Sequence, residues 1–150
     1  MRLNRVVGLP AVLGGRTLGH VERAVLDRAS LQLRGFTVRR GLLGARWVSR
    51  ENVAVLGEVS VVLRAEPGRL PRDTDFTLGA VMDESGLTLG LVTDLWICPE
   101  SLGITAVEVS LGPLEDLRGG RRRVRAWTVI AGDGGDAQLM IPRSEWEVRE

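Results

Sequence analysis

An internal repeat constrains the fold of this 150-residue chain more than any other feature of its sequence. A shift of 71 positions places the first half on the second without a gap. The residues Gly8, Gly15, Thr17, Leu18, Gly19, Val21, Ser30, Leu31, Val38, Gly41 and Leu43 then fall on identical residues: Gly79, Gly86, Thr88, Leu89, Gly90, Val92, Ser101, Leu102, Val109, Gly112 and Leu114. Backbone geometry and burial select turn glycines and core apolar residues. The repeat therefore predicts one small fold, duplicated.

Chain length and composition indicate how the two copies are organised. A lone copy of about 70 residues is marginally stable, because a small domain buries too little of its surface. Apolar residues make up 44% and charged residues 26%, as in ordinary globular proteins. We expect domains at 1–65 and 73–150 that support each other, joined by the Pro/Gly-containing linker Ala65–Arg72.

Short Val/Leu runs between glycine turns predict a mainly β fold. In the first copy we expect strands near Leu3–Leu9, His20–Asp27, Leu33–Arg40, Arg46–Ser49 and Val59–Arg64, with a helical turn at Ser49–Asn52. In the second copy we expect strands near Phe76–Met82, Leu91–Cys98, Ala106–Leu111 and Arg121–Ile130, with a helical turn from Pro113. The fold class that follows is two small antiparallel β-barrels in tandem, with short helical turns.

The second copy diverges after Leu114. A shift of 93 positions places Val48 on Ile141 and Arg50 on Arg143, which predicts an insert of about 22 residues near 113–137. The chain then lacks a counterpart of the last strand of the first copy. We expect the inserted strand, or a strand from another subunit, to fill that place.

The repeated pattern resembles the PRC-barrel family. The first copy carries Val7-Gly8-Leu9-Pro10, then Gly15-Arg16-Thr17-Leu18-Gly19, then Leu33-Arg34-Gly35-Phe36-Thr37-Val38. The second copy keeps Gly86-Leu87-Thr88-Leu89-Gly90 and Ala106-Val107-Glu108-Val109, but has Cys98 in place of Asp27. Members include the cytoplasmic part of the photosynthetic reaction-centre H subunit and the C-terminal domain of a ribosome maturation factor. The resemblance implies small β-barrels that dock on other macromolecules, with no catalytic residue set.

Charge is divided unevenly along the chain, with a net +8 up to Arg72 and a net −7 from Asp73 onward. The two halves could dock on each other, copies could associate head to tail, or the basic half could bind an anionic partner such as RNA. Chance asymmetry of solvated charge is a fourth interpretation. The densest basic cluster is Arg39, Arg40, Arg46 and Arg50, with Trp47 among them, and we expect this cluster to be the binding surface. Arg121, Arg122, Arg123 and Arg125 fit an edge strand protected by charge.

Reactive residues are too few for an enzyme or a metal site. His20 is the sole histidine and Cys98 the sole cysteine, so we expect no catalytic residues, no metal and no cofactor. Asp133 and Asp136 suit a hydrogen-bonded turn better than a cation site. Cys98 is expected to be a small buried residue, and Trp96, Trp127 and Trp146 are expected in the core or between the barrels.

These features predict a non-catalytic interaction or assembly module in the cytoplasm. The lone cysteine fits a reducing compartment, and the longest apolar runs fall short of the roughly 20 residues that span a membrane. The expected partner is another protein or a second copy of the chain. The alternative is ribosomal RNA or a ribosomal protein, bound through the Arg-rich first half as in a maturation factor.

Overall fold

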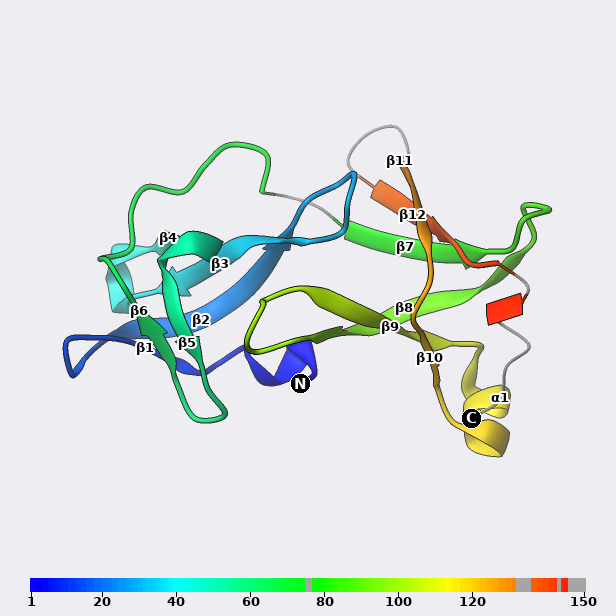
Figure 1. Ribbon diagram of the computed structural model, residues 1–150, viewed down its shortest axis with the longest axis horizontal. Helices are drawn as coiled ribbons and strands as arrows, with labels where there is room; N and C mark the ends of the chain where they lie inside the picture. Colours follow the sequence, from blue (N-terminus) through cyan, green and yellow to red (C-terminus); the bar gives the residue numbers. More distant parts are fainter. Residues whose placement is uncertain (75–76, 132–135, 143, 146–150) are drawn as a thin grey trace.

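The chain folds into two six-stranded β-sheets, which confirms the mainly β class (Figure 1). The computed structural model describes residues 1–74, 77–131, 136–142 and 144–145. The first sheet contains β1 (Pro10–Leu13), β2 (Arg16–Leu26), β3 (Leu33–Arg39), β4 (Ala45–Ser49), β5 (Val53–Leu56) and β6 (Val61–Leu63). The second contains β7 (Thr77–Met82), β8 (Thr88–Ile97), β9 (Ile104–Ser110), β10 (Arg122–Val124), β11 (Thr128–Ala131) and β12 (Asp136–Met140).

Four short helical elements have both ends in the described part of the chain. Three are 3-10 turns, η1 (Leu3–Arg5), η2 (Gly41–Leu43) and η3 (Arg50–Asn52), and the fourth is the helix α1 (Pro113–Gly119). The helical turns predicted before Val53 and from Pro113 are confirmed as η3 and α1. Pro113 stands in the first turn of α1, where its missing N–H costs no hydrogen bond.

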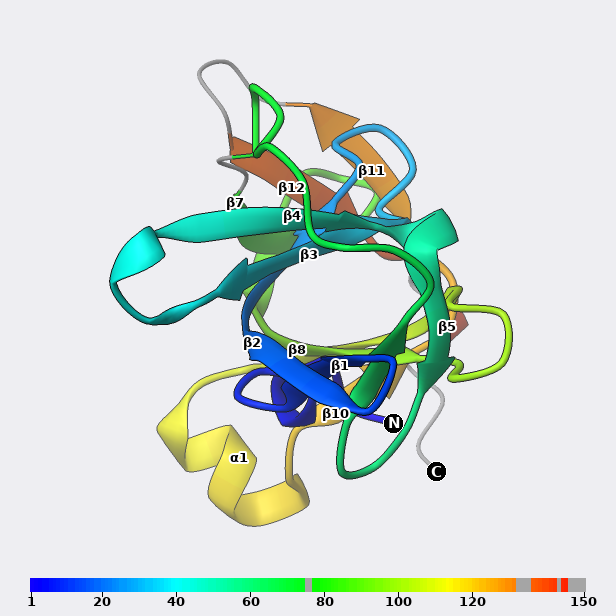
Figure 2. The same ribbon diagram turned by 90° about the vertical axis from the view of Figure 1, so that its left-hand side faces the viewer.

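The two sheets have the same strand order. It runs β4-β3-β2-β1-β6-β5 in the first sheet and β10-β9-β8-β7-β12-β11 in the second. In each sheet one pair is parallel, β1 with β6 and β7 with β12, while the other described pairs are antiparallel. Figure 2 shows the first sheet curling round on itself. Duplication is therefore visible in the topology as well as in the sequence.

The central hairpins of the two sheets preserve the repeat residue by residue. Val21 pairs with Val38 in the β2–β3 ladder, and Val92 pairs with Val109 in the β8–β9 ladder, each 71 positions later. The hairpin turns also match, because Leu31 has a φ of 64° and Leu102 a φ of 60°. Positive φ is costly for a leucine, so the same unusual turn at both places is strong evidence of common descent.

The offset of 71 does not extend to every strand. By their pairing partners, Pro10 to Val12 of β1 correspond to Ala80 to Met82 of β7, so the offset in this strand is 70 positions, not 71. Gly8, with a φ of 92°, therefore precedes its strand, whereas Gly79 lies inside β7. The predicted strand Leu3–Leu9 is wrong for the same region: η1 occupies Leu3–Arg5, and β1 begins at Pro10.

The second sheet is complete without a 22-residue insert. Trp47 in β4 pairs with Thr37 of β3, and Arg123 in β10 pairs with the equivalent Glu108 of β9, so β10 is the counterpart of β4. The two strands β11 and β12 then correspond to β5 and β6. The alignment at 93 positions is misleading because apolar and arginine residues recur in several strands. In the second copy α1 stands where the first has the shorter turn η2. Of the residues used for that alignment, Arg143 lies outside the described part.

One apolar core joins the copies. Buried side chains of both sheets form a single cluster that includes Phe36, Val38, Leu95, Ile97 and Leu139. Segments that precede each copy cross to the other, since the N–H of Ile97 donates to the Met1 carbonyl at 2.8 Å and Arg23 donates to the Thr74 hydroxyl at 3.5 Å. None of the described helices is long and apolar enough to cross a membrane.

A glycine near the start of the longest strand in each copy, Gly19 in β2 and Gly90 in β8, allows the neighbouring backbone to approach closely. A Cβ at Gly90 would lie 2.2 Å from the Ser110 carbonyl oxygen, and one at Gly19 would lie 2.5 Å from the carbonyl oxygen of Arg39. Arg39 and Ser110 are again equivalent in the repeat. The two glycines are thus conserved between the copies because no side chain fits there.

We predict that Gly90→Ala lowers the free energy of unfolding by about 1–3 kcal/mol, because the added methyl group overpacks the β8–β9 ladder. Gly119→Ala is the matched control, since nothing lies within 4 Å of its Cβ position. Urea unfolding of both variants measures the difference. Equal stability of the two variants would contradict the close approach as the reason for Gly90.

Candidate docking surface

The predicted arginine cluster is divided by the structure. Arg39 at the end of β3 donates two hydrogen bonds to Glu22 Oε1, at 2.7 and 3.1 Å. Arg50 in η3 donates to the Ser101 carbonyl of the other copy at 2.8 Å. Both guanidinium groups therefore contribute to contacts within the chain, and we remove them from the candidate surface.

Trp47 is half-buried, and other parts of the chain pack against it. Its backbone exchanges two hydrogen bonds with Gly68 of the linker, at 2.9 and 2.7 Å, which lays the linker alongside β4. Its ring carbons lie 2.8 Å from the Cβ position of Gly35, and the Arg34 guanidinium is 6.0 Å from the ring centroid. The half-buried ring packs outside the sheet, on the opposite side from the buried Val48.

Arg40 and Arg46 flank an exposed apolar turn, which we name the first leucine tip (Leu42 and Leu43). The relative exposure is 106% for Leu42 and 67% for Leu43. Gly41 and Gly44 bound the turn with φ values of 55° and 80°, which is the left-handed region that glycine adopts without strain. In the described part of the chain neither arginine has an ion-pair partner, so both side chains are available beside the leucines.

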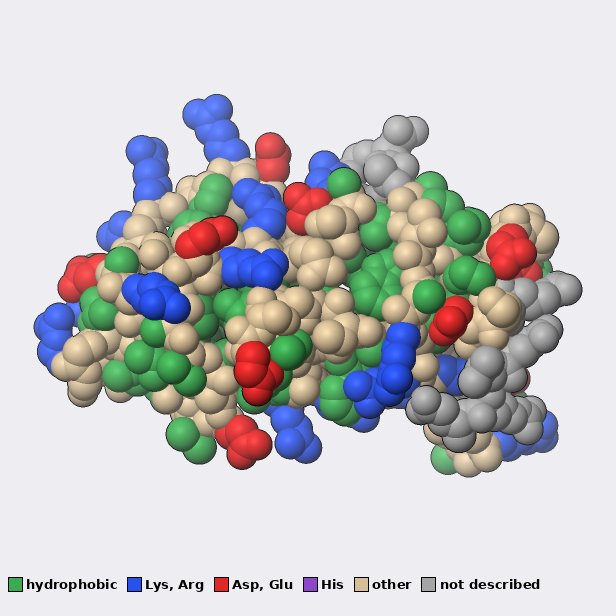
Figure 3. Space-filling view, in the orientation of Figure 1, with side chains coloured by type: hydrophobic (Ala, Val, Ile, Leu, Met, Phe, Trp, Pro, Cys, Tyr) green, Lys and Arg blue, Asp and Glu red, His purple; other side chains and the backbone are tan. Residues whose placement is uncertain are grey.

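Sequence reasoning alone does not single out these leucines. Gly41 and Leu43 recur in the second copy, which assigns them to the fold, and apolar residues are usually counted as core. A signal was present, because an apolar pair enclosed by two glycines inside an arginine-rich segment marks a turn that projects from a sheet. Figure 3 shows arginine side chains projecting from the left-hand part of the molecule, which holds the first copy.

The second copy carries a similar feature on α1, the second leucine tip (Leu114 and Leu117). These side chains are 68% and 84% exposed. The helix follows Gly112, whose φ is 125°, as η2 begins with Gly41. Glu115 stands beside Leu114 and is exposed, and among the described residues it forms no ion pair.

A buried carboxylate links the N-terminal segment to the second copy. Glu108 is 4% exposed and lies 2.9 Å from Arg2 Nη1 and 3.4 Å from Arg121 Nη1. The Thr93 hydroxyl donates to the same carboxylate at 3.0 Å. Such charge-assisted contacts compensate for removing the carboxylate from water. Arg2 belongs to the basic half of the chain and Glu108 to the acidic half, so this ion pair joins the two oppositely charged halves.

Trp96 lies beside this cluster between two arginines. The guanidinium carbons of Arg2 and Arg123 are 5.2 and 4.1 Å from its ring centroid. The predicted contact between the copies is thus confirmed for Trp96, which also forms an antiparallel bridge with Arg2. Its buried Nε1 has no hydrogen-bond partner among the described residues. We assign these residues to the contact between the copies.

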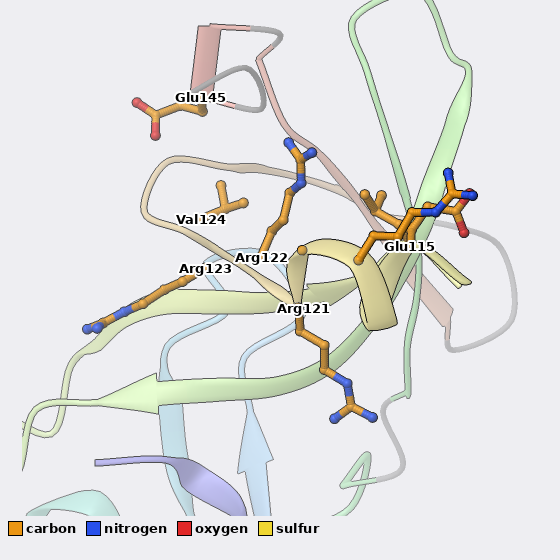
Figure 4. A pocket seen from close by; sticks show the side chains of 10 residues that line it. Glu115, Arg121, Arg122, Arg123, Val124 and Glu145 are labelled. Carbon is orange, nitrogen blue, oxygen red and sulfur yellow. The ribbon is translucent and has the colours of Figure 1, made fainter. Parts of the chain in front are cut away.

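The basic segment from Arg121 borders a cavity of about 660 Å³ between α1, β10 and Glu145. β10 is an edge strand of the second sheet, as predicted. In Figure 4 Arg122 points to the same side as Glu145, whereas Arg121 and Arg123 point away from it. Arg121 reaches Glu108, and Arg123 covers Trp96, so these two residues do more than protect an edge. Basic and acidic side chains both line this cavity, so its lining does not indicate one class of ligand.

The remaining predicted residues are spread over the structure. His20 lies in β2 and pairs with Pro10 and Arg39. The half-buried Cys98 donates from its thiol to Glu100 Oε2 at 3.2 Å, and this bond lowers the pKa of Glu100. Within the described ranges no three His, Cys, Asp or Glu residues gather as metal ligands. Trp127 packs against the core as predicted, while Asp133 and Trp146 lie outside the described residues.

Asp27 and Cys98 occupy the same place in the two hairpin turns. The N–H of Leu31 donates to the Asp27 carbonyl at 2.9 Å, and the N–H of Leu102 donates to the Cys98 carbonyl at 2.8 Å. Only the aspartate also accepts through its side chain, from the backbone N–H groups of Ser30 and Ala29. These bonds lower the pKa of Asp27. The Asp27 carboxylate therefore stabilises the fold at pH values above the usual aspartate pKa, and this stabilisation is lost as the pH falls through the lowered pKa.

The chain matches no known protein-family profile. No curated protein sequence is significantly similar to it.

We predict that Glu108→Gln lowers the free energy of unfolding by about 1–3 kcal/mol, since both arginines lose a charged hydrogen-bond acceptor. Glu58→Gln is the matched control, because Glu58 is exposed in the β5–β6 turn. The control should change stability by less than about 0.5 kcal/mol in urea unfolding. If both variants behave alike, Glu108 does not stabilise the contact between the copies.

Proposed function

We propose that this protein is a non-catalytic docking module, built as a tandem pair of PRC-barrel-like domains, that binds another protein through the first leucine tip. The observation that carries the proposal is the exposure of Leu42 and Leu43 between Arg40 and Arg46. The identical strand order and the curl of the first sheet support the tandem arrangement. The curl of the first sheet fits the small barrel that the repeated motifs suggest (Figure 2).

The tip has the composition of a contact site between proteins. An exposed leucine keeps apolar surface in water, and each one that is buried on binding contributes roughly 1.5–3 kcal/mol. Flanking arginines favour a partner that presents carboxylates around the apolar patch, because guanidinium groups bind carboxylates in two-pronged geometry. We therefore expect an acidic rim around an apolar groove on the partner.

RNA is the second candidate for the same arginines. The unpaired Arg40 and Arg46 suit a phosphate backbone as well as carboxylates. Trp47 does not serve as a stacking platform for bases, because the linker lies along it and its ring contacts the sheet. The leucines have no role in binding phosphates, so the protein partner is favoured.

We predict that an immobilised Leu42→Ser, Leu43→Ser double variant loses a partner protein that the unmodified chain captures from nuclease-treated lysate. Val59→Ser is the matched control, because Val59 is also exposed, at 79%, in a different turn. The control should retain the partner, identified by mass spectrometry. Capture that survives the double substitution would reject the docking role of the tip. Capture that occurs only in lysate without nuclease would also reject it.

A further inference from the structure

One pair of repeated apolar residues is not explained by burial in the core. Leu43 and Leu114 are 71 positions apart, and both follow a positive-φ glycine that lies two residues beyond its strand. Burial accounts for repeated residues such as Val38 and Val109, which are about 1% and 0% exposed. Leu43 and Leu114 are 67% and 68% exposed, so packing within the chain does not account for a leucine at both places.

The two elements that carry the leucine tips, η2 and α1, lie on the same side of the molecule (Figure 2). In Figure 1 η2 and α1 lie towards opposite ends of the long axis, and in Figure 2 both extend to the left. The shared core and the crossing segments hold the copies together, so the separation of the tips is set by the fold. A partner that contacts both tips at once therefore needs two matching sites in a defined arrangement.

The two tips differ in the charge beside the leucines. Arg40 and Arg46 flank the first leucine tip, whereas the second has Glu115 next to Leu114 and the exposed Arg118 next to Leu117. Glu115 is therefore the group of the second tip that can pair with an arginine of the first. Contact between two first tips would bring arginines together, which is unfavourable. Contact between a first tip and a second tip buries leucine on leucine and places arginine near glutamate.

We propose that the partner at the leucine tips is a second copy of this chain, with the first tip of each copy on the second tip of the other. This proposal rests on the docking role proposed above and names its partner. A twofold axis makes the tip-to-tip contact twice and closes the assembly as a dimer, so it does not continue into a filament. The dimer is reversible, because two small apolar contacts with charged rims bury less surface than an obligate interface.

The test is sedimentation equilibrium of the purified chain over a range of concentrations. We expect a monomer–dimer equilibrium that Leu43→Ser or Leu114→Ser alone weakens by at least about tenfold, since each variant alters both contacts of the dimer. Leu87→Ser is the matched control: Leu87 is 61% exposed, and its repeat position holds Arg16. The control should dimerise as the unmodified chain does.

Mixing the two leucine variants tests the pairing itself. A heterodimer of the Leu43→Ser and Leu114→Ser chains contains one contact in which both leucines are intact, so the mixture should associate more strongly than either variant alone. Charge reversal gives an independent check, because Arg40→Glu and Glu115→Arg should each weaken the dimer and together restore it. Failure of both restorations would overturn the proposed pairing.

The outcome separates this inference from the proposed function. A chain that stays monomeric at all concentrations, or that dimerises equally well after both leucine substitutions, would overturn self-association. The docking role would still stand if capture of a different protein depended on Leu42 and Leu43. Loss of both results would reject both proposals.

Discussion

Burial of the two central hairpins in one shared core is the constraint on which the rest of the structure depends. Leu31 and Leu102 adopt the same positive-φ conformation at the hairpin turns, and both are buried. Gln32 of the first turn accepts a hydrogen bond from the N–H of Ile104, directly beyond the second turn, at 2.9 Å. The turns therefore meet at the contact between the copies, where exposing either one would leave a strained leucine in water.

The segments that precede each copy strengthen this contact. The N–H of Asn4, ahead of the first sheet, donates to Asp94 in the second copy at 3.2 Å, and Arg34 of the first copy donates to the carbonyl of Asp73 at 3.0 Å. Each copy thus contributes a segment to the other, and the separation of the leucine tips follows from the fold. A preorganised pair of contact points binds with less loss of conformational entropy than two independent ones.

Charge is used differently in the two copies. In the second copy Asp83, Asp94 and Glu108 are 5%, 7% and 4% exposed and accept hydrogen bonds within the chain. In the first copy Arg40 and Arg46 remain on the surface beside exposed leucines. Three acids of the second copy are therefore held inside the fold, whereas Arg40 and Arg46 of the first copy face solvent.

The sequence by itself determined the duplication, the mainly β class and the two short helical elements, because turn glycines, strand alternation and Pro113 act locally. It could not determine the strand equivalences after Leu114, since similar residues recur in several strands and only hydrogen-bond register distinguishes them. It grouped Arg40 and Arg46 with Arg39 and Arg50, which the tertiary structure engages with Glu22 and Ser101. It also counted Leu43 and Leu114 as core. Exposure depends on where a turn lies relative to the whole molecule, so only the tertiary structure decided that these two repeated leucines face solvent.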